Sequence, residues 1–373
     1  MSSNVVVGFG EIMTRLSSPG FSRLRQCLPG TLDASFAGAE SNIASAVAVL
    51  GGRSRYVTAL PRNVLGDACV GFLGGFGVQT QHILRSDTGR MAQYFIETGA
   101  GQRPGRVLYD REHSTFSLTP GAAYDWEGAL NDAAWLVITG ISPALSPMAA
   151  EATLYAARQA KERGVRVCCD LNFRASLWNW EPGTPPRQLA RRVMGSIMPH
   201  VDLLLTNPEQ AEDVLGIPWN PETLGKGGDS GRISEIPITD SYGQAARRIG
   251  QAHPHIQQVV FTMRESLSAS HNNLGALLYD LASDRVYLAP LIDGHYAPYQ
   301  MQQIVDRLGA GDAFAGALLY AMHTPSLDNP QSALSFAVAA GCLAHTIPGD
   351  INLVTRSEVE ALSAGDRSGR VMR

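Results

Sequence analysis

The chain lacks the patterns that mark most protein-held metal and redox sites. Its 373 residues include 5 cysteines, none of them in a CxxC sequence, and there is no HExxH sequence. An odd number of cysteines without regular spacing favours free thiols in a reducing compartment. We therefore expect no protein-held metal site built from cysteine or histidine.

Charge and long apolar runs are also scarce. Charged residues make up 17% of the chain, the formal net charge is −4 and the pI is near 6.1. This balance gives no basic footprint for nucleic acid or for an anionic membrane. The apolar run at residues 5–9 is too short for a signal sequence, and no run has the length of a membrane span. We expect a cytoplasmic protein whose partners are small molecules, with no nucleic acid and no membrane.

What the chain does have is a regular alternation of strand and helix patterns. Apolar residues make up 45% of it, enough for a large core. Strands are expected at 4–12, 54–60, 135–140, 165–170, 202–206 and 257–262, and helices at 40–51, 67–77, 146–163, 208–215 and 242–251. Such alternation predicts an α/β fold with a mostly parallel sheet and helices on both faces. We expect a single domain over residues 1–373.

Two segments break the alternation. Residues 91–117 indicate two strands joined by a glycine-rich connection, with Val107, Tyr109 and Arg111 alternating onto one strand face. Residues 217–241 are rich in Gly, Pro, Ser and Asp without periodicity, which predicts a surface loop.

Polar residues follow the predicted strands where each strand ends. They are Asp170, Asn172 and Arg174 after one strand, Asn207 and Glu209 after the next, then Thr262, Arg264, Glu265 and Ser266, and finally Asp306 after an apolar pair at 304–305. Ligands of open parallel sheets bind beyond the carboxyl ends of the strands. We therefore expect these side chains to converge on one binding site.

The segment 306–322, DRLGAGDAFAGALLYAM, points to the ligand. Gly309, Ala310 and Gly311 precede a helix expected from about Asp312, and the start of a helix suits an anion. Taken alone, Asp312 in this position favours a helix cap. The chain has only two lysines, neither in a P-loop, and no GxGxxG follows the first strand.

These observations favour a kinase that works without a P-loop lysine. Backbone amides at the helix start would hold the transferred phosphoryl group, and the Asp312 carboxylate would take the proton of the attacking hydroxyl. At the positive end of a helix we expect the pKa of Asp312 to be low.

Residues 306–319 resemble the second signature of the ribokinase-like (pfkB) carbohydrate kinases, in which the last aspartate is the catalytic base. Residues 35–51 resemble the first, sugar-binding signature, and residues 333–362 resemble the nucleotide-flanking helix and closing loop. Within the family, segments 107–112, 170–178, 260–273 and 365–373 are similar to 2-keto-3-deoxygluconate kinases.

The resemblance implies a fold, a reaction and a site. A β lid from about 12–37 and 91–117 would close over the sugar and pair with a second subunit, giving a homodimer or higher homo-oligomer. ATP with Mg²⁺ would phosphorylate 2-keto-3-deoxygluconate (2-dehydro-3-deoxy-D-gluconate) to its 6-phosphate, with Asp312 as the base and Gly309, Ala310 and Gly311 as the anion hole. The implied sugar-acid contacts are Gly38, Tyr94, Tyr109, Arg111, Arg174 and Asp350. The implied ATP contacts are Asn172, Asn207, Thr262, Arg264 and Ser266.

Departures from the family pattern leave alternatives open. The usual Asn-x-x-Glu, which helps organise Mg²⁺, ends in Gln210, so either Glu209 or Glu212 compensates or metal binding is weaker. Arg264 faces the nucleotide or is a surface arginine, and Arg174 binds the sugar acid or pairs with Asp170. The alternative functions are a sister kinase for fructose, ribose or a nucleoside, and a sugar-acid-binding protein without catalysis.

Overall fold

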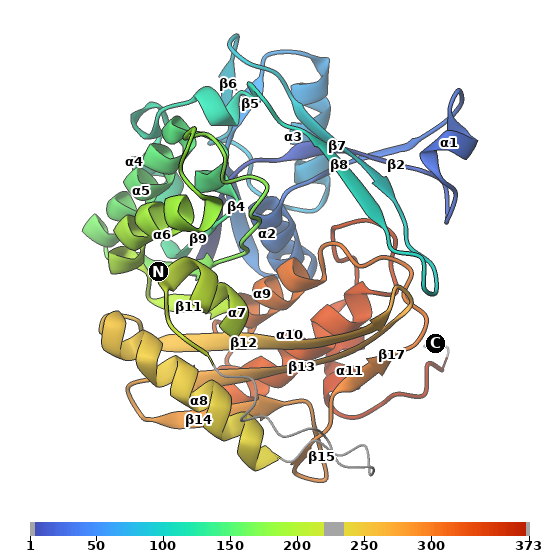
Figure 1. The fold of residues 1–373 in the computed structure, drawn as a ribbon, viewed down its shortest axis with the longest axis vertical. Coiled ribbons are helices and arrows are strands. Elements are labelled where there is room, and N and C mark those ends of the chain that lie inside the picture. Colours follow the sequence, from blue (N-terminus) through green and yellow to red (C-terminus); the bar gives the residue numbers. More distant parts are fainter. Residues whose placement is uncertain (1–3, 220–234, 371–373) are drawn as a thin grey trace.

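The protein is described by a computed structural model covering residues 4–219 and 235–370, and its centre is a nine-stranded sheet (Figure 1). The strand order is β14-β13-β12-β11-β10-β9-β1-β4, and β17 also pairs with β13. The strands are β1 (Val5–Phe9), β4 (Arg53–Val57), β9 (Ala133–Thr139), β10 (Arg166–Asp170), β11 (Leu203–Thr206), β12 (Gln258–Ser268), β13 (His271–Asp280), β14 (Arg285–Ala289) and β17 (Tyr299–Met301). From β4 to β12 all neighbours are parallel, and only the pairs made by β13 are antiparallel. The predicted mostly parallel sheet is confirmed.

Helices cover both faces of this sheet, as the alternation predicts. One face carries α4 (Trp126–Leu130), α5 (Pro147–Glu162), α6 (Pro186–Ile197) and α8 (Glu235–Ala252); the other carries α2 (Ala39–Val49), α9 (Ala310–Ala321), α10 (Pro330–Ala344) and α11 (Arg356–Ser363). Strand β1 shows why two cores form: Val5 and Val7 pack on the first face and Val6 on the second, because successive side chains of a strand point to opposite sides.

A second, four-stranded sheet projects beside the carboxyl edge of the first (Figure 1). We call it the lid sheet; its order is β3 (Asp33–Ala37), β2 (Met13–Ser17), β7 (Ala92–Glu97) and β8 (Arg106–Asp110). Its strands fall in the two segments from which the sequence predicts a β lid. At its tip, Gly101 exchanges hydrogen bonds with the turn between β12 and β13: the Gly101 N–H donates to Ser270 Oγ at 2.9 Å, and the Ala269 N–H donates to the Gly101 carbonyl at 2.7 Å. The lid sheet therefore touches the main body at both of its ends.

The remaining elements connect these layers. They are α1 (Leu24–Cys27), α3 (Val64–Gly75), α7 (Pro208–Gln210), β5 (Ala59–Pro61), β6 (Leu84–Ser86), β15 (Leu291–Ile292) and β16 (His295–Tyr296), with single turns at Phe116–Leu118, Gly121–Ala123, Ser142–Ala144, Met198–His200 and Ala211–Leu215. Within residues 4–219 and 235–370, no helix combines the length and the apolar character that crossing a membrane requires.

The structure corrects several expected boundaries. Helix α8 begins at Glu235 and not at 242, because Ile238 and Ser241 continue the buried face formed by Ala245 and Ile249; of the predicted loop 217–241, residues 220–234 lie outside the described part. Strand β12 runs on to Ser268, because it pairs with β13 along its length. Residues 304–305 are not in a strand, so Asp306 follows a loop.

Candidate active site

A cavity of about 560 Å³ lies between the carboxyl ends of the parallel strands, the lid sheet and the start of α9. It brings together the predicted site residues from all parts of the chain. Those that line it are Gly38, Tyr94, Tyr109, Arg111, Asn172, Arg174, Asn207, Thr262, Arg264, Gly309, Ala310, Gly311, Asp312 and Asp350. Ser266 lies outside this lining, and its Oγ accepts a hydrogen bond from Arg307 Nη2 at 3.2 Å. Its expected contact with ATP stays a prediction.

The start of α9 forms the floor of the cavity. The helix begins at Ala310, two residues earlier than expected, with Gly309 as its N-cap in the left-handed region at φ 77°. A Cβ at Gly309 would collide with the backbone carbonyl of Asp350, so only glycine fits there. A Cβ at Gly311 would meet nothing within 4 Å. The first turn of α9 therefore faces open space that suits an anion at a helix N-terminus.

Asp312 stands at this helix start but is not a cap for it. Its Oδ2 accepts a hydrogen bond from Asn42 Nδ2 at 2.7 Å, and Asn42 Oδ1 in turn accepts one from the Gly38 N–H at 3.3 Å. Asp312 is partly buried at the floor of the cavity, and desolvation raises its pKa to about 8, helped by the charges of Asp170, Asp350 and Glu40. The expected low pKa is wrong, because burial and like charges outweigh the Asn42 hydrogen bond and the helix end. A carboxyl with this pKa is a stronger base than a free aspartate.

Two further carboxyl groups surround Asp312 and also resist ionisation. Glu40 is buried and accepts hydrogen bonds from Thr139 Oγ1 at 2.8 Å and Ser142 Oγ at 2.9 Å; burial raises its pKa to about 7. Burial likewise raises the pKa of Asp170 to about 6, although its Oδ1 accepts the Asn172 N–H at 3.1 Å. When these groups are ionised, their negative charges raise the pKa of the proposed base further.

The lid sheet supplies the sugar side of the cavity. Tyr94 and Tyr109 are paired across β7 and β8 with ring centroids 5.8 Å apart, and Tyr109 is 42% exposed. Arg111, just beyond β8, is not free: its Nη2 and Nε both lie 2.7 Å from Glu11 Oε2. The backbone of Glu11 also lies against Gly38, where a Cβ would collide with the Glu11 carbonyl. Glu11 thus supports Gly38 through its backbone and balances the charge of Arg111 through its side chain.

Three arginines line the cavity without a carboxylate partner among the described residues. They are Arg174, Arg264 and Arg307. Arg174 Nη1 donates to the Phe173 carbonyl at 3.1 Å, and it forms no ion pair with Asp170 in the described part of the chain. Burial lowers the pKa of Arg264, as do the charges of Arg307 and Arg174. The cavity therefore combines unpaired positive charge with a helix start, which suits a ligand carrying several negative charges.

The residues present fit ATP with Mg²⁺. Asn207 caps α7, its Oδ1 accepting the Gln210 N–H at 2.8 Å, and Glu209 and Gln210 line the cavity beside it. The described residues contain no group of three or more His, Cys, Asp or Glu side chains placed to hold a metal ion. The oxygen donors beside Asn207 are those of Glu209 and Gln210, and Mg²⁺ is bound through oxygen ligands, one or two of them carboxylates, together with waters and substrate phosphates.

Sequence reasoning missed several residues of the site. Asn42 was visible only as a residue near a helix start, and Arg307 only as part of the glycine-rich segment. His345, which hydrogen-bonds through Nδ1 to the Gly341 carbonyl at 2.8 Å and lines the cavity, gave no signal. Arg15, described below, was one polar residue in an expected lid strand. Asn42, Arg307 and Arg15 have partners far away in the sequence, at Asp312, Asn272 and Asp306.

Comparison with known proteins gives one consistent result. The model of the pfkB family carbohydrate kinases matches residues 1–234. A 2-dehydro-3-deoxygalactonokinase of Haloferax volcanii is 30% identical over 366 residues, covering 98% of both chains. The crystal structure of 2-dehydro-3-deoxygluconokinase from Thermotoga maritima is 37% identical, covers 97% of this chain and 100% of that one, and superposes with a TM-score of 0.83. Fructokinase-2 of Solanum habrochaites is 27% identical over 371 residues, covering 98% of this chain and 97% of that protein.

The family match spans more than half of the chain, and the Haloferax relative matches it from end to end. The fold, the cavity at the carboxyl edge and the glycine-rich start of α9 agree with this relationship. The chain therefore belongs to the pfkB family of carbohydrate kinases, and it is an ATP-dependent sugar kinase.

Proposed function

We propose that this kinase transfers the γ-phosphoryl group of ATP to the terminal hydroxyl of a 2-keto-3-deoxy sugar acid, forming the 6-phosphate of 2-keto-3-deoxygluconate. Support comes from relatives named for the gluconate and galactonate forms of this acid. The observation that carries the proposal is Arg174, a guanidinium that lines the cavity without a carboxylate partner among the described residues.

Arg174 and Arg111 differ in whether a carboxylate of the protein balances their charge. The positive charge of Arg111 is balanced by Glu11 at 2.7 Å, so Arg111 can orient a substrate carboxylate without adding net charge. Arg174 has no such partner within residues 4–219 and 235–370, and a sugar carboxylate would give it one. A neutral sugar would leave this cation unpaired, which lowers the affinity for fructose or ribose.

The proposed chemistry uses the residues at the start of α9. Asp312 accepts the proton of the terminal hydroxyl as the new oxygen–phosphorus bond forms, and the amides of Gly309, Ala310 and Gly311 stabilise the charge on the transferred group. Asn42 holds the Asp312 carboxylate in place through its 2.7 Å hydrogen bond. Bound Mg²⁺ would neutralise charge on the ATP phosphates, beside Asn207, Glu209 and Gln210. Thr262 and Arg264 on β12 and Asn172 after β10 line the cavity where the nucleotide is expected.

The test is a panel of acceptors assayed for ADP release with ATP and Mg²⁺. The panel contains 2-keto-3-deoxygluconate, its galactonate epimer, fructose, ribose and a nucleoside. Arg174→Ala should lower kcat/KM for the acid by roughly 10- to 200-fold, since a charged hydrogen bond contributes about 1.5–3 kcal/mol. Arg174→Lys should recover only part of this, because lysine offers no planar fork.

A matched control is Arg187→Ala, which removes an exposed arginine of α6 that pairs with Asp213 outside the cavity lining. It should leave kcat/KM unchanged. The second candidate function is a sister kinase for a neutral sugar, favoured by the fructokinase relatives. Equal efficiency of the wild type on fructose or ribose and on the keto-deoxy acid would refute the carboxylate assignment in favour of that candidate. Tight binding of the acid without its phosphorylation would show that the acid is not the substrate of this kinase.

The lid sheet is also the proposed contact with a second subunit. Strand β8 is one of its two edge strands, with no further β-partner among the described residues, and Leu108 on it is 64% exposed. Exposed edges of this kind favour pairing with another chain. We expect a homodimer or higher homo-oligomer, which sedimentation or light scattering of the whole protein would detect.

A further inference from the structure

We propose that Arg15 is a positioning residue for phosphoryl transfer, tying the lid sheet to the two loops that shape the anion hole. This inference rests on the sugar-kinase activity and not on the identity of the sugar acid. Arg15 lies on β2, its side chain is 4% exposed, and it is not part of the cavity lining. It therefore acts through other residues and not by touching substrate.

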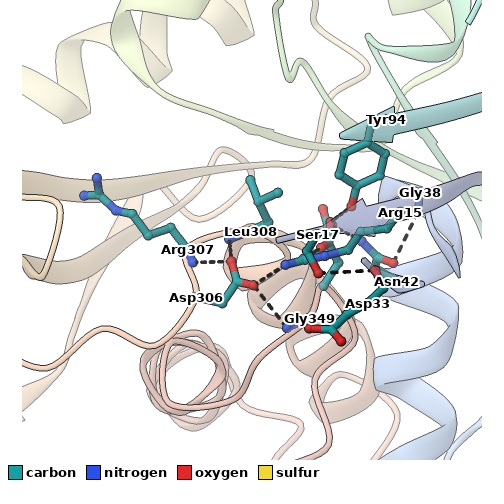
Figure 2. Close-up of polar contacts among 12 residues, drawn as sticks. Arg15, Ser17, Asp33, Gly38, Asn42, Tyr94, Asp306, Arg307, Leu308 and Gly349 are labelled. Atoms are coloured by element: carbon teal, nitrogen blue, oxygen red, sulfur yellow. Dashed lines mark hydrogen bonds and ion pairs between the residues drawn. The ribbon is translucent and has the colours of Figure 1, made fainter. Parts of the chain in front are cut away.

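The guanidinium of Arg15 bridges two carboxylates from separate loops (Figure 2). Its Nη2 lies 2.5 Å from Asp306 Oδ2, and its Nη1 donates to Asp350 Oδ1. Burial alone would lower the pKa of Arg15, but the charges of Asp350 and Asp306 outweigh it and raise that pKa. The arginine is therefore charged at any working pH, and it pairs with both buried carboxyl groups at once.

Asp306 passes this constraint to the backbone that leads into the anion hole (Figure 2). Its Oδ1 accepts the N–H groups of Arg307 at 2.7 Å and Leu308 at 3.1 Å, and its Oδ2 also accepts the Gly349 N–H at 3.1 Å. The next residue, Gly309, packs directly against the backbone of Asp350. One arginine thus fixes both sides of the contact on which the start of α9 rests.

The same arginine belongs to a row of side chains across the lid sheet. Arg15 pairs with Tyr94 between β2 and β7, and Tyr94 pairs with Tyr109 between β7 and β8. Paired residues on neighbouring strands share a face of the sheet. Tyr94 also donates its hydroxyl to Asp350 Oδ2 at 2.9 Å. Arg15 therefore links the proposed sugar contacts Tyr94 and Tyr109 to the loop of Asp306, which leads into the proposed anion hole.

The test compares Arg15→Gln, Arg15→Lys and the wild type for kcat, KM and binding of ADP with Mg²⁺. ADP is the chosen probe because it lacks the transferred group and so reports on the nucleotide site alone. Arg15→Gln should lower kcat by about tenfold to a hundredfold, the usual effect of displacing a reacting group by about 1 Å. Its ADP affinity should stay close to that of the wild type. Arg15→Lys should restore part of kcat, since one ammonium cannot bridge both carboxylates as a fork.

A control for general destabilisation is Arg55→Gln. Arg55 is as buried as Arg15 and pairs with Asp132 at 3.2 Å. Asp132 directly precedes β9, so it lies at the amino ends of the parallel strands, whereas the cavity lies at their carboxyl ends. This variant should have a lower melting temperature than the wild type, but its folded molecules should keep the wild-type kcat. If Arg15→Gln has a kcat within about threefold of the wild type, or loses no more per folded molecule than Arg55→Gln, the proposal is overturned.

Folding failure of Arg15→Gln would leave Asp306→Asn as the deciding variant. Asparagine keeps an acceptor for the Arg307 and Leu308 amides but removes the charge that holds Arg15. A wild-type kcat in Asp306→Asn would overturn the proposal, and a reduced kcat with unchanged ADP binding would support it. All assays use whichever sugar of the panel the wild type phosphorylates, so a wrong sugar assignment changes the acceptor and not this comparison.

Discussion

Replacing Asp312 with asparagine tests both its proposed role and its unusual ionisation. The Asp312→Asn variant keeps an oxygen that can accept the Asn42 hydrogen bond, so binding of sugar and ADP should persist. Without a base for the sugar hydroxyl, kcat should fall by about 10²- to 10⁴-fold. Because the pKa of Asp312 is raised to about 8, wild-type kcat/KM should increase with pH and level off above that value. A near-wild-type kcat in the variant would refute the assignment of Asp312 as the base.

The same substitution makes a prediction about stability. The folded protein holds the Asp312 proton between the ordinary pKa of 3.8 and about 8, whereas the unfolded chain releases it. The contribution of this group to the free energy of unfolding therefore decreases as the pH rises through that window. At 1.36 kcal/mol per unit, the Asp312→Asn variant should gain at most about 2.7 kcal/mol on the wild type between pH 5 and pH 7.

Denaturant melts of both proteins at several pH values measure this difference. Glu40 and Asp170, whose pKa values are also raised, are present in both proteins and largely cancel. Asp328→Asn, which removes an exposed carboxylate, is the control and should run parallel to the wild type. Parallel stability curves for Asp312→Asn and the wild type, together with a flat pH–rate profile, would show that the pKa of Asp312 is not raised.

Two further predictions concern the glycines of the anion hole and the metal. Gly309→Ala should destabilise the protein by more than about 1–2 kcal/mol, because a left-handed backbone and the Asp350 carbonyl both oppose a Cβ; Gly311→Ala should melt like the wild type yet lose activity, since its methyl group would enter the open space at the helix start. Equal melting temperatures for the two variants would contradict this distinction. Activity should require Mg²⁺ despite Gln210, because ATP supplies most of the ligands of this ion, and Gln210→Glu should keep activity or tighten the metal requirement. Turnover that survives thorough chelation would rule out the magnesium prediction.

Local patterns in the sequence were sufficient for the fold. The alternation of buried strands and amphipathic helices predicts the parallel sheet, and residues 91–117 predict two lid strands. The site residues after β10 and β11 follow from the rule for strand ends, because this rule depends only on local order and on a parallel sheet. The helix after the glycine-rich segment was also predictable, although its start was misplaced by two residues.

Long-range pairing could not be derived in this way. Arg15 meets Asp306 and Asp350 across sequence separations of 291 and 335 residues, and Asn42 meets Asp312 across 270. No periodicity connects such residues. The pKa of Asp312 was mispredicted for the same reason: its helix is local, but the carboxylates of Asp170, Glu40 and Asp350 that surround it come from distant segments.

Because the lid sheet is long, a small rotation where it joins the body would move its two ends by very different distances. Glu11 lies just before strand β2 where the lid sheet joins the body, and it touches Gly38 through its backbone and Arg111 through its side chain. From this junction the hairpin formed by β7 and β8 extends roughly 25–30 Å to Gly101, at about 3.3 Å per residue. A rotation of about 10° at this junction would move Gly101 by roughly 5 Å. It would move Tyr109, which is two residues from Arg111, by only about 1 Å. Such a rotation would separate Gly101 from Ala269 and Ser270, and it would also stretch the contacts that Arg15 and Tyr94 make with Asp350.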